Sequence, residues 1–170
     1  MKERNEGNAA SGMRAAVTAG VLLGIGMGGF ADGILFHQIL QLHNMLSNTV
    51  PRDSLVNEQI NMFWDGLFHA FTWMVTAAGI WIMWHTGRHR ATVPTGRMLW
   101  GSLMAGWGLF NVVEGTIDHE LLQVHHVYQN GNHGLWDAVF LVVGVGLLVC
   151  GAAVVRAEMR VLAGMRASEV

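Results

Sequence analysis

Residues 106–128, GWGLFNVVEGTIDHELLQVHHVY, place a group of ionisable side chains inside an otherwise apolar stretch. The group consists of acids and histidines: Glu114, Asp118, His119, Glu120, His125 and His126. The flanking residues are apolar enough to face lipid, where an ionisable side chain is costly and therefore usually points into the protein. The stretch thus predicts a membrane-embedded helix that carries a buried polar site.

The same pattern occurs a second time, earlier in the chain. Sliding the sequence along itself aligns an acid, a glycine, a Leu-Gln pair and two histidines with their counterparts: Asp32-Gly33 with Glu114-Gly115, His37 with His119, Leu40-Gln41 with Leu122-Gln123, and His43 with His125. A second, slightly shorter offset aligns Trp64-Asp65 with Trp136-Asp137. Matches of this kind indicate internal duplication. They predict a tandem repeat of two-helix units.

The composition is that of a membrane protein. Hydrophobic residues make up 52% of the 170 residues and charged residues only 13%, whereas soluble domains carry about 25% charged residues. Four apolar segments, 15–46, 60–84, 98–126 and 135–155, each reach the length of about 20 residues that a membrane helix needs. Because lipid tolerates only closed backbone hydrogen bonding, we expect an all-α fold. The predicted four-span bundle is residues 15–156, flanked by cytoplasmic tails 1–14 and 157–170.

The basic residues predict the orientation. Nine of the ten lie before the first segment, between the second and third, or after the fourth, and only Arg52 lies elsewhere. The positive-inside rule then places both termini in the cytoplasm. No basic face suggests nucleic acid as a partner. The single cysteine, Cys150, excludes an intramolecular disulfide.

With this topology the polar residues gather in the outer half of the bundle. At ~1.5 Å of rise per residue, three histidines from three helices fall at one depth: His37, His69 and His119. Together they predict a metal site, and Asp118 beside His119 is a further candidate ligand. His43 and His125, near the outer boundary, are candidate ligands too. The remaining polar residues are expected to orient ligands or to form a proton path: Asp32, Asp65, Glu114, Asp137 and His126.

Four segments of the sequence resemble one known family. They are GGFADGILFHQILQLHNML (28–46), WDGLFHAFTW (64–73), GWGLFNVVEGTIDH (106–119) and LLQVHHV (121–127), and they resemble the bacterial membrane family named domain of unknown function 2243. The resemblance extends from about Gly24 to Gly151 and implies a four-span protein of the bacterial inner membrane. The family brings no established activity, so it assigns no catalytic residue. It suggests respiratory oxidase assembly proteins that handle copper as partners.

Several functions remain open at this point. The histidines could hold copper, zinc or iron, either for catalysis or for delivery to an oxidase. Alternatively, a histidine pair could ligate haem b across the bundle, either His37 with His119 or His43 with His125. The acids Asp32, Glu114 and Asp118 could instead form a proton or ion path. A purely structural scaffold and self-association are also open. Leu141 stands where the repeat would place a counterpart of His69, which favours three histidines with an open coordination position.

Overall fold

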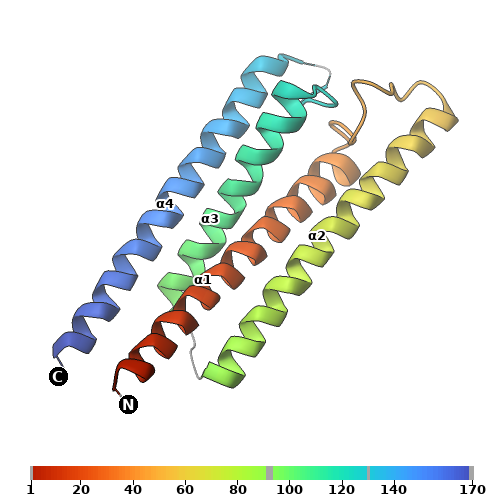
Figure 1. Ribbon diagram of the computed structural model, residues 1–170. Coiled ribbons are helices and arrows are strands. Elements are labelled where there is room, and N and C mark those ends of the chain that lie inside the picture. The colour runs from red at the N-terminus through yellow and green to blue at the C-terminus, as the bar shows by residue number, and fades with distance from the viewer. Residues whose placement is uncertain (1, 91–93, 130, 169–170) are drawn as a thin grey trace.

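The computed structural model describes residues 2–90, 94–129 and 131–168. Helices dominate these residues, and no strand occurs among them. In chain order they are α1 (Lys2–Ala31), the π-helix η1 (Asp32–Ile39), α2 (Leu55–Arg90), α3 (Gly96–Glu114), the π-helix η2 (Gly115–Leu121) and α4 (His133–Ser168). Figure 1 shows the four α-helices side by side in the order α4, α3, α1, α2, with both termini at the same end. The predicted all-α fold is confirmed.

Three of these helices are long and apolar enough to cross a membrane. They span Ala10–Ile39, Leu55–Arg88 and His133–Met165. The third segment expected from the sequence, residues 98–126, is not among them; it contains most of α3, which passes into η2. The helices α1 and α4 also include most of the predicted tails. Met1 and residues 169–170 lie outside the described residues, and the division into tails stays a prediction.

Small residues let α1 and α3 approach each other closely. A Cβ at Gly24 would lie 2.9 Å from the backbone carbonyl carbon of Leu103, and one at Gly28 would lie 3.0 Å from the Trp107 ring. Backbones can pack this closely only where side chains are absent. This close contact makes α1 and α3 the centre of the bundle.

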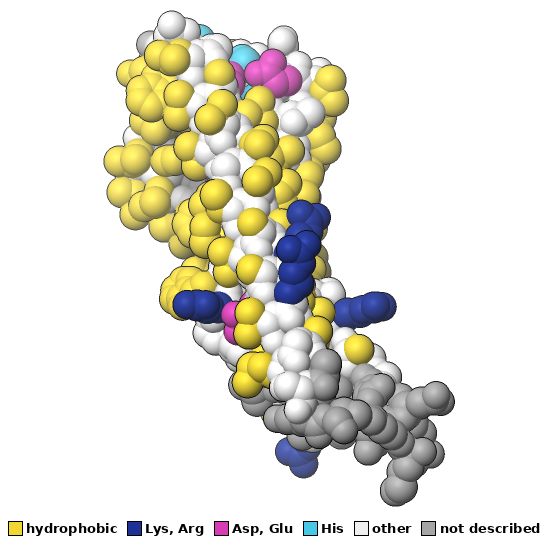
Figure 2. Space-filling model, turned by 90° about the vertical axis from the view of Figure 1, so that its left-hand side faces the viewer, with side chains coloured by type: hydrophobic (Ala, Val, Ile, Leu, Met, Phe, Trp, Pro, Cys, Tyr) yellow, Lys and Arg dark blue, Asp and Glu magenta, His cyan; other side chains and the backbone are white. Residues whose placement is uncertain are grey.

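The helices α2 and α4 pack on α1 and α3, respectively, and their outer faces carry exposed large hydrophobic residues. Trp73 on α2 is 65% exposed and Val142 on α4 is 71% exposed. Figure 2, which faces the α4 side, shows hydrophobic side chains over much of the surface and Lys and Arg side chains toward the end that carries the termini. Apolar surface of this extent suits a lipid environment.

The two π-helices are what position the polar residues. Each ends in the same way: Leu40 N donates to Leu35 O at 2.8 Å, and Leu122 N donates to Ile117 O at 2.8 Å. The next residues, Gln41 and Gln123, have positive φ angles of 51° and 50°, an uncommon conformation for a residue with a side chain. The backbone therefore turns sharply at both places, and the residues that follow fold back against the bundle. Wide helical turns of this kind are frequent at functional sites.

Candidate metal centre

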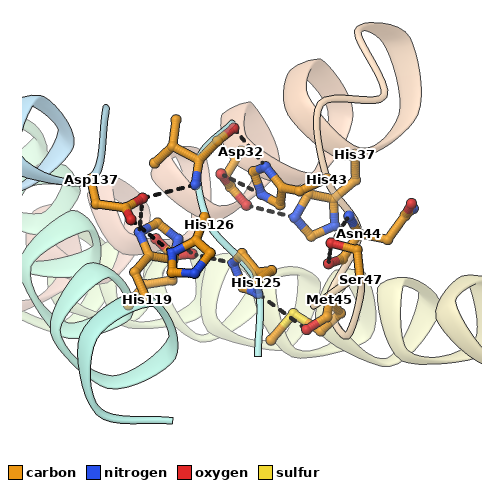
Figure 3. A network of polar contacts seen from close by, with 12 residues as sticks. Asp32, His37, His43, Asn44, Met45, Ser47, His119, His125, His126 and Asp137 are labelled. Atoms are coloured by element: carbon orange, nitrogen blue, oxygen red, sulfur yellow. Dashed lines mark hydrogen bonds and ion pairs between the residues drawn. The ribbon is translucent and has the colours of Figure 1, made fainter. Parts of the chain in front are cut away.

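Four buried histidine rings meet at the end of the bundle opposite the termini (Figure 3). His37 and His119 come from η1 and η2, and His43 and His125 come from the segments that fold back after them. Ring centroids are 4.6 Å apart for His37 and His43, and 4.8 Å apart for His119 and His125. The rings of His43 and His125 stack at 4.7 Å with 7° between their planes. None of the four is more than 2% exposed.

The Nδ1 atom of each ring faces an oxygen that can only accept a hydrogen bond. His37 Nδ1 lies 2.9 Å from Asp65 Oδ1. His43 Nδ1 lies 3.0 Å from the carbonyl oxygen of Val127, and His125 Nδ1 lies 3.1 Å from that of Met45. Because these oxygens accept, the three Nδ1 atoms carry the hydrogen. In a neutral imidazole the other nitrogen, Nε2, is then an unprotonated acceptor.

The Nδ1 atom of the fourth ring, His119, also faces an acceptor oxygen, but at a longer distance. His119 Nδ1 lies 3.4 Å from Asp137 Oδ1, beyond an ordinary hydrogen bond. This distance suffices to aim Nδ1 at a carboxylate and Nε2 in the opposite direction, as in the other three rings.

All four Nε2 atoms face two inner carboxylates, Asp32 and Glu114. Glu114 Oε1 lies 2.9 Å from the Nε2 atom of His125 and 3.1 Å from that of His119. Asp32 Oδ2 lies 3.1 Å from His37 Nε2, and Asp32 Oδ1 lies 3.9 Å from His43 Nε2. An unprotonated nitrogen and a carboxylate oxygen repel each other at such distances. A proton or a cation between them removes the repulsion.

Asp65 and Asp137 also fix the segments that carry the inner rings. The backbone N–H of Met45 donates to Asp65 Oδ1 at 2.8 Å, and the backbone N–H of Val127 donates to Asp137 Oδ1 at 2.9 Å. The second oxygen of Asp65 accepts from the Asn44 side chain. Each carboxylate thus faces a ring nitrogen and a backbone donor together, which orients the ligand set.

The clustered atoms fall into two overlapping groups. Among the described residues, one ligand atom each from His37, His43 and His125 lie within 4.8 Å of one another, as do those from Glu114, His119 and His125. Such spacing lets one ion contact three ligands. The groups share His125, so two ions would be close neighbours.

Burial keeps His43 in the form that can bind metal. Its burial, together with the nearby rings of His125 and His37, lowers the pKa of His43 well below its usual value. The imidazole is therefore neutral near pH 7, and only neutral imidazole binds metal.

The structure places most of the predicted site residues together. His37, His43, His119, His125, Asp32 and Glu114 form the cluster, and Asp65, Asp137 and His126 lie at its edge; His126 Nδ1 donates to Asp137 Oδ2 at 2.8 Å. The sequence did not indicate the carbonyl groups of Met45 and Val127 or the Asn44 side chain. Backbone acceptors leave no sequence signal, although the alignment that pairs His43 with His125 also pairs Met45 with Val127.

His69 and Asp118 lie outside the cluster, so the expected convergence of His37, His69 and His119 does not occur. The Nδ1 atom of His69 lies 2.9 Å from the carbonyl oxygen of Asp65 on its own helix, and its ring stacks on Phe30. The depth argument assumed straight α-helices as far as the outer loops. Instead η1 ends at Ile39, and the fold-back returns His43 to the level of His37.

The comparison with protein families gives one match. The family described as "Predicted membrane protein (DUF2243)" matches residues 19–158, which include every residue of the cluster. Comparisons with curated proteins and with solved structures give no match. The match extends over most of the chain and agrees with the resemblance noted in the sequence. This chain therefore belongs to the DUF2243 family of predicted membrane proteins.

Proposed function

We propose that this protein is a membrane metalloprotein that binds two transition-metal ions in the histidine cluster. The observation that carries the proposal is the orientation of the rings. Three Nδ1 atoms bond to acceptors at 2.9–3.1 Å, so the Nε2 lone pairs point at the carboxylates of Asp32 and Glu114. Metal ions between the Nε2 atoms and the carboxylates would remove this repulsion and make both groups ligands. The acceptors at Nδ1 would then orient the imidazole rings, as hydrogen-bond acceptors do around metal-bound histidine.

The two ions would occupy equivalent positions of a tandem repeat. Support comes from contacts that recur between residues paired by the internal alignment. They are the ring contacts to the inner acids (His37–Asp32 and His119–Glu114), the bonds to the opposite segment (His43–Val127 and His125–Met45), and the bonds to the outer acids (Met45–Asp65 and Val127–Asp137). One ion would be bound by Asp32, His37 and His43, and the other by Glu114, His119 and His125. The repeat thus assigns the shared His125 to the second ion, and Asp32, the counterpart of Glu114, completes the first set.

The donor set favours a borderline divalent ion. Imidazole suits zinc, copper, iron and nickel, and carboxylate is a hard ligand, whereas copper(I) prefers the sulfur of cysteine or methionine. Cys150, the only cysteine, is exposed on α4. We therefore favour iron, zinc or copper(II) over a copper(I) delivery site. With three protein ligands for each ion, open positions remain, as in catalytic rather than structural sites.

The haem b alternative receives less support. A haem bound by both His43 and His125 must lie between their rings, and the 4.7 Å between the centroids leaves no room for a macrocycle there.

We further propose that α3 and η2 form a fourth span, and that the protein lies in the inner membrane of a bacterium, as the family resemblance implies. The distribution of basic residues supports cytoplasmic termini, and the centre then lies in the outer half of the bundle. Reporter fusions at the C-terminus test the orientation: a reporter active only outside the cytoplasm would refute it. Oxidase assembly proteins as partners remain a suggestion of the family resemblance.

Metal analysis of the detergent-purified protein tests the central proposal. We expect about two ions per chain, by the one-ion-per-group ligand count, and the element found identifies the metal. His37→Gln and His119→Gln should each remove one ion, whereas His85→Ala, at the far end of α2, should retain both. Size-exclusion chromatography checks that each variant is folded. A folded wild-type protein without metal after growth and reconstitution with each ion, or folded variants that keep full occupancy, would refute the metal centre.

A further inference from the structure

A cavity of about 490 Å³ reaches the cluster from the side of the bundle. Its walls are almost entirely apolar and include Trp64, Phe71, Phe110 and Ile117, and its polar residues are Glu114 and Asp118. Several wall residues are open to the exterior: Trp64 is 42% exposed and Phe71 is 50% exposed. The cavity therefore connects the apolar outer surface of the bundle with an acid of the centre.

A smaller cavity of about 350 Å³ occupies the equivalent place in the other half. The two alignments of the internal repeat relate its lining to that of the large cavity: Trp136 corresponds to Trp64, Leu35 to Ile117, and Asp32 to Glu114. One difference changes its chemistry. Phe36 lines the small cavity where Asp118 lines the large one, so only the large cavity has two carboxylates.

Two carboxyl groups lie at the inner wall of this cavity, that of Asp118, which is half-buried, and that of Glu114. The Oε1 atom of Glu114 contacts His119 and His125, while its Oε2 atom is buried and makes no hydrogen bond to any described residue. The side chain of Glu114 is 6% exposed. Glu114 therefore adds negative charge next to the cavity, whereas the half-buried carboxylate of Asp118 is the acceptor that a bound molecule can reach.

We propose that the large cavity binds a membrane-dissolved molecule with an apolar body and a hydroxyl head group, which donates to Asp118 beside Glu114. The apolar walls suit a hydrocarbon or aromatic body, and two carboxylates repel an anionic head. A hydroxyl group loses less solvation than an ammonium ion on entering such walls. The inference deepens the proposed function by naming the class of molecule that reaches the centre. Binding in the cavity does not depend on the proposed metal centre, but any reaction of the bound molecule rests on it.

Photolabelling of the full-length protein in nanodiscs tests this proposal. The probe is a dodecyl chain with a diazirine in the chain and a primary alcohol head, and the matched probes carry a carboxylate or an amine. We expect the alcohol to label the walls of the large cavity, mapped by mass spectrometry of the peptides around Phe71 and Phe110. The carboxylate should label them on the order of tenfold less, because one hydrogen bond to a charged acceptor contributes about 1.5 kcal/mol.

Two variants separate the cavity from general lipid contact. Asp118→Phe copies the small cavity and should reduce labelling on the order of tenfold, for the same hydrogen-bond energy. Adding Phe36→Asp to it should move the labelling to the peptide around Trp136. Asp118→Leu, which has a smaller apolar side chain without an acceptor, replaces Asp118→Phe if the latter does not fold.

Three results would overturn the proposal. They are equal labelling by all three probes, labelling that the variants leave unchanged, and labelling by the amine alone. The same experiment on metal-free and metal-loaded protein separates the two proposals. Selective labelling of a protein that binds no metal refutes only the metal centre, and a metal-loaded protein without selective labelling refutes only the hydroxyl-binding cavity.

Discussion

Replacing Asp65 with Asn tests whether the outer carboxylates hold the centre in its geometry. Asp65 Oδ1 accepts from His37 Nδ1 at 2.9 Å and from the backbone N–H of Met45 at 2.8 Å, and the second oxygen accepts from Asn44. Asparagine keeps one acceptor oxygen and turns an NH₂ group toward a donor. At least one hydrogen bond to a charged group is then lost, and the new NH₂ group faces another hydrogen-bond donor.

The structure sets the size of the effect. A hydrogen bond to an ionised group contributes about 1.5–3 kcal/mol, so the loss of one or two such bonds should lower the free energy of unfolding by about 2–6 kcal/mol. The His37 ring also loses the partner that orients it. Loss of such a partner typically weakens metal binding about 10–100-fold, and we expect this reduction for the ion bound by Asp32, His37 and His43.

Asp137→Asn is the matched control. Asp137 holds Val127 and His126 at 2.9 and 2.8 Å, but its distance to His119 Nδ1 is 3.4 Å. We therefore expect a similar loss of stability and a smaller loss of metal affinity. Competition against a chromophoric chelator measures the affinity, and thermal unfolding in detergent measures the stability. Wild-type affinity in Asp65→Asn, or an equal loss in both variants, would refute the role assigned to Asp65.

Three further predictions follow from single contacts. His69→Leu should leave the metal content unchanged in elemental analysis, because this ring lies outside the cluster; loss of an ion would return His69 to the ligand set. Gly24→Val should lower the melting temperature strongly by separating α1 from α3, whereas Gly146→Val on α4, with nothing within 4 Å, should change it little; equal effects in calorimetry would contradict the close packing. In the metal-free protein, the unfolded state takes up a proton at His43 below pH ~6.5, whereas burial lowers the pKa of His43 in the folded state and keeps this proton off. The free energy of unfolding should therefore fall by up to about 1.4 kcal/mol per pH unit as the pH decreases below that value. His43→Gln should flatten this dependence in denaturant titrations, and an unchanged slope would contradict it.

The sequence predicted the helices and most of the cluster, because both depend on local patterns. Apolar length predicts helices in lipid. The repeat identified His37, His43, His119 and His125 as related pairs. It did not show which of them share a site.

The ligand set itself depended on backbone conformation. Counting depth along straight helices put His69 level with His37 and left His43 at the boundary. The π-helix and the positive φ angle of Gln41 reverse that order, and neither follows from composition or periodicity. Likewise, the acceptors of His43 and His125 are backbone carbonyls, which every residue has and which only the folded chain selects.

The hydrogen bonds of the inner rings cross between the halves of the chain. His43 bonds to the carbonyl of Val127, and His125 bonds to that of Met45, so each half sets the tautomer of a ring in the other. A chain severed between α2 and α3 would give two fragments, neither with a correctly oriented pair of rings. Coexpressed fragments should recover metal only by reassembling, and metal content would then measure complementation. Keeping both halves in one polypeptide has a further consequence that an assembly of identical subunits would lack: one half can carry Asp118 where the other carries Phe36.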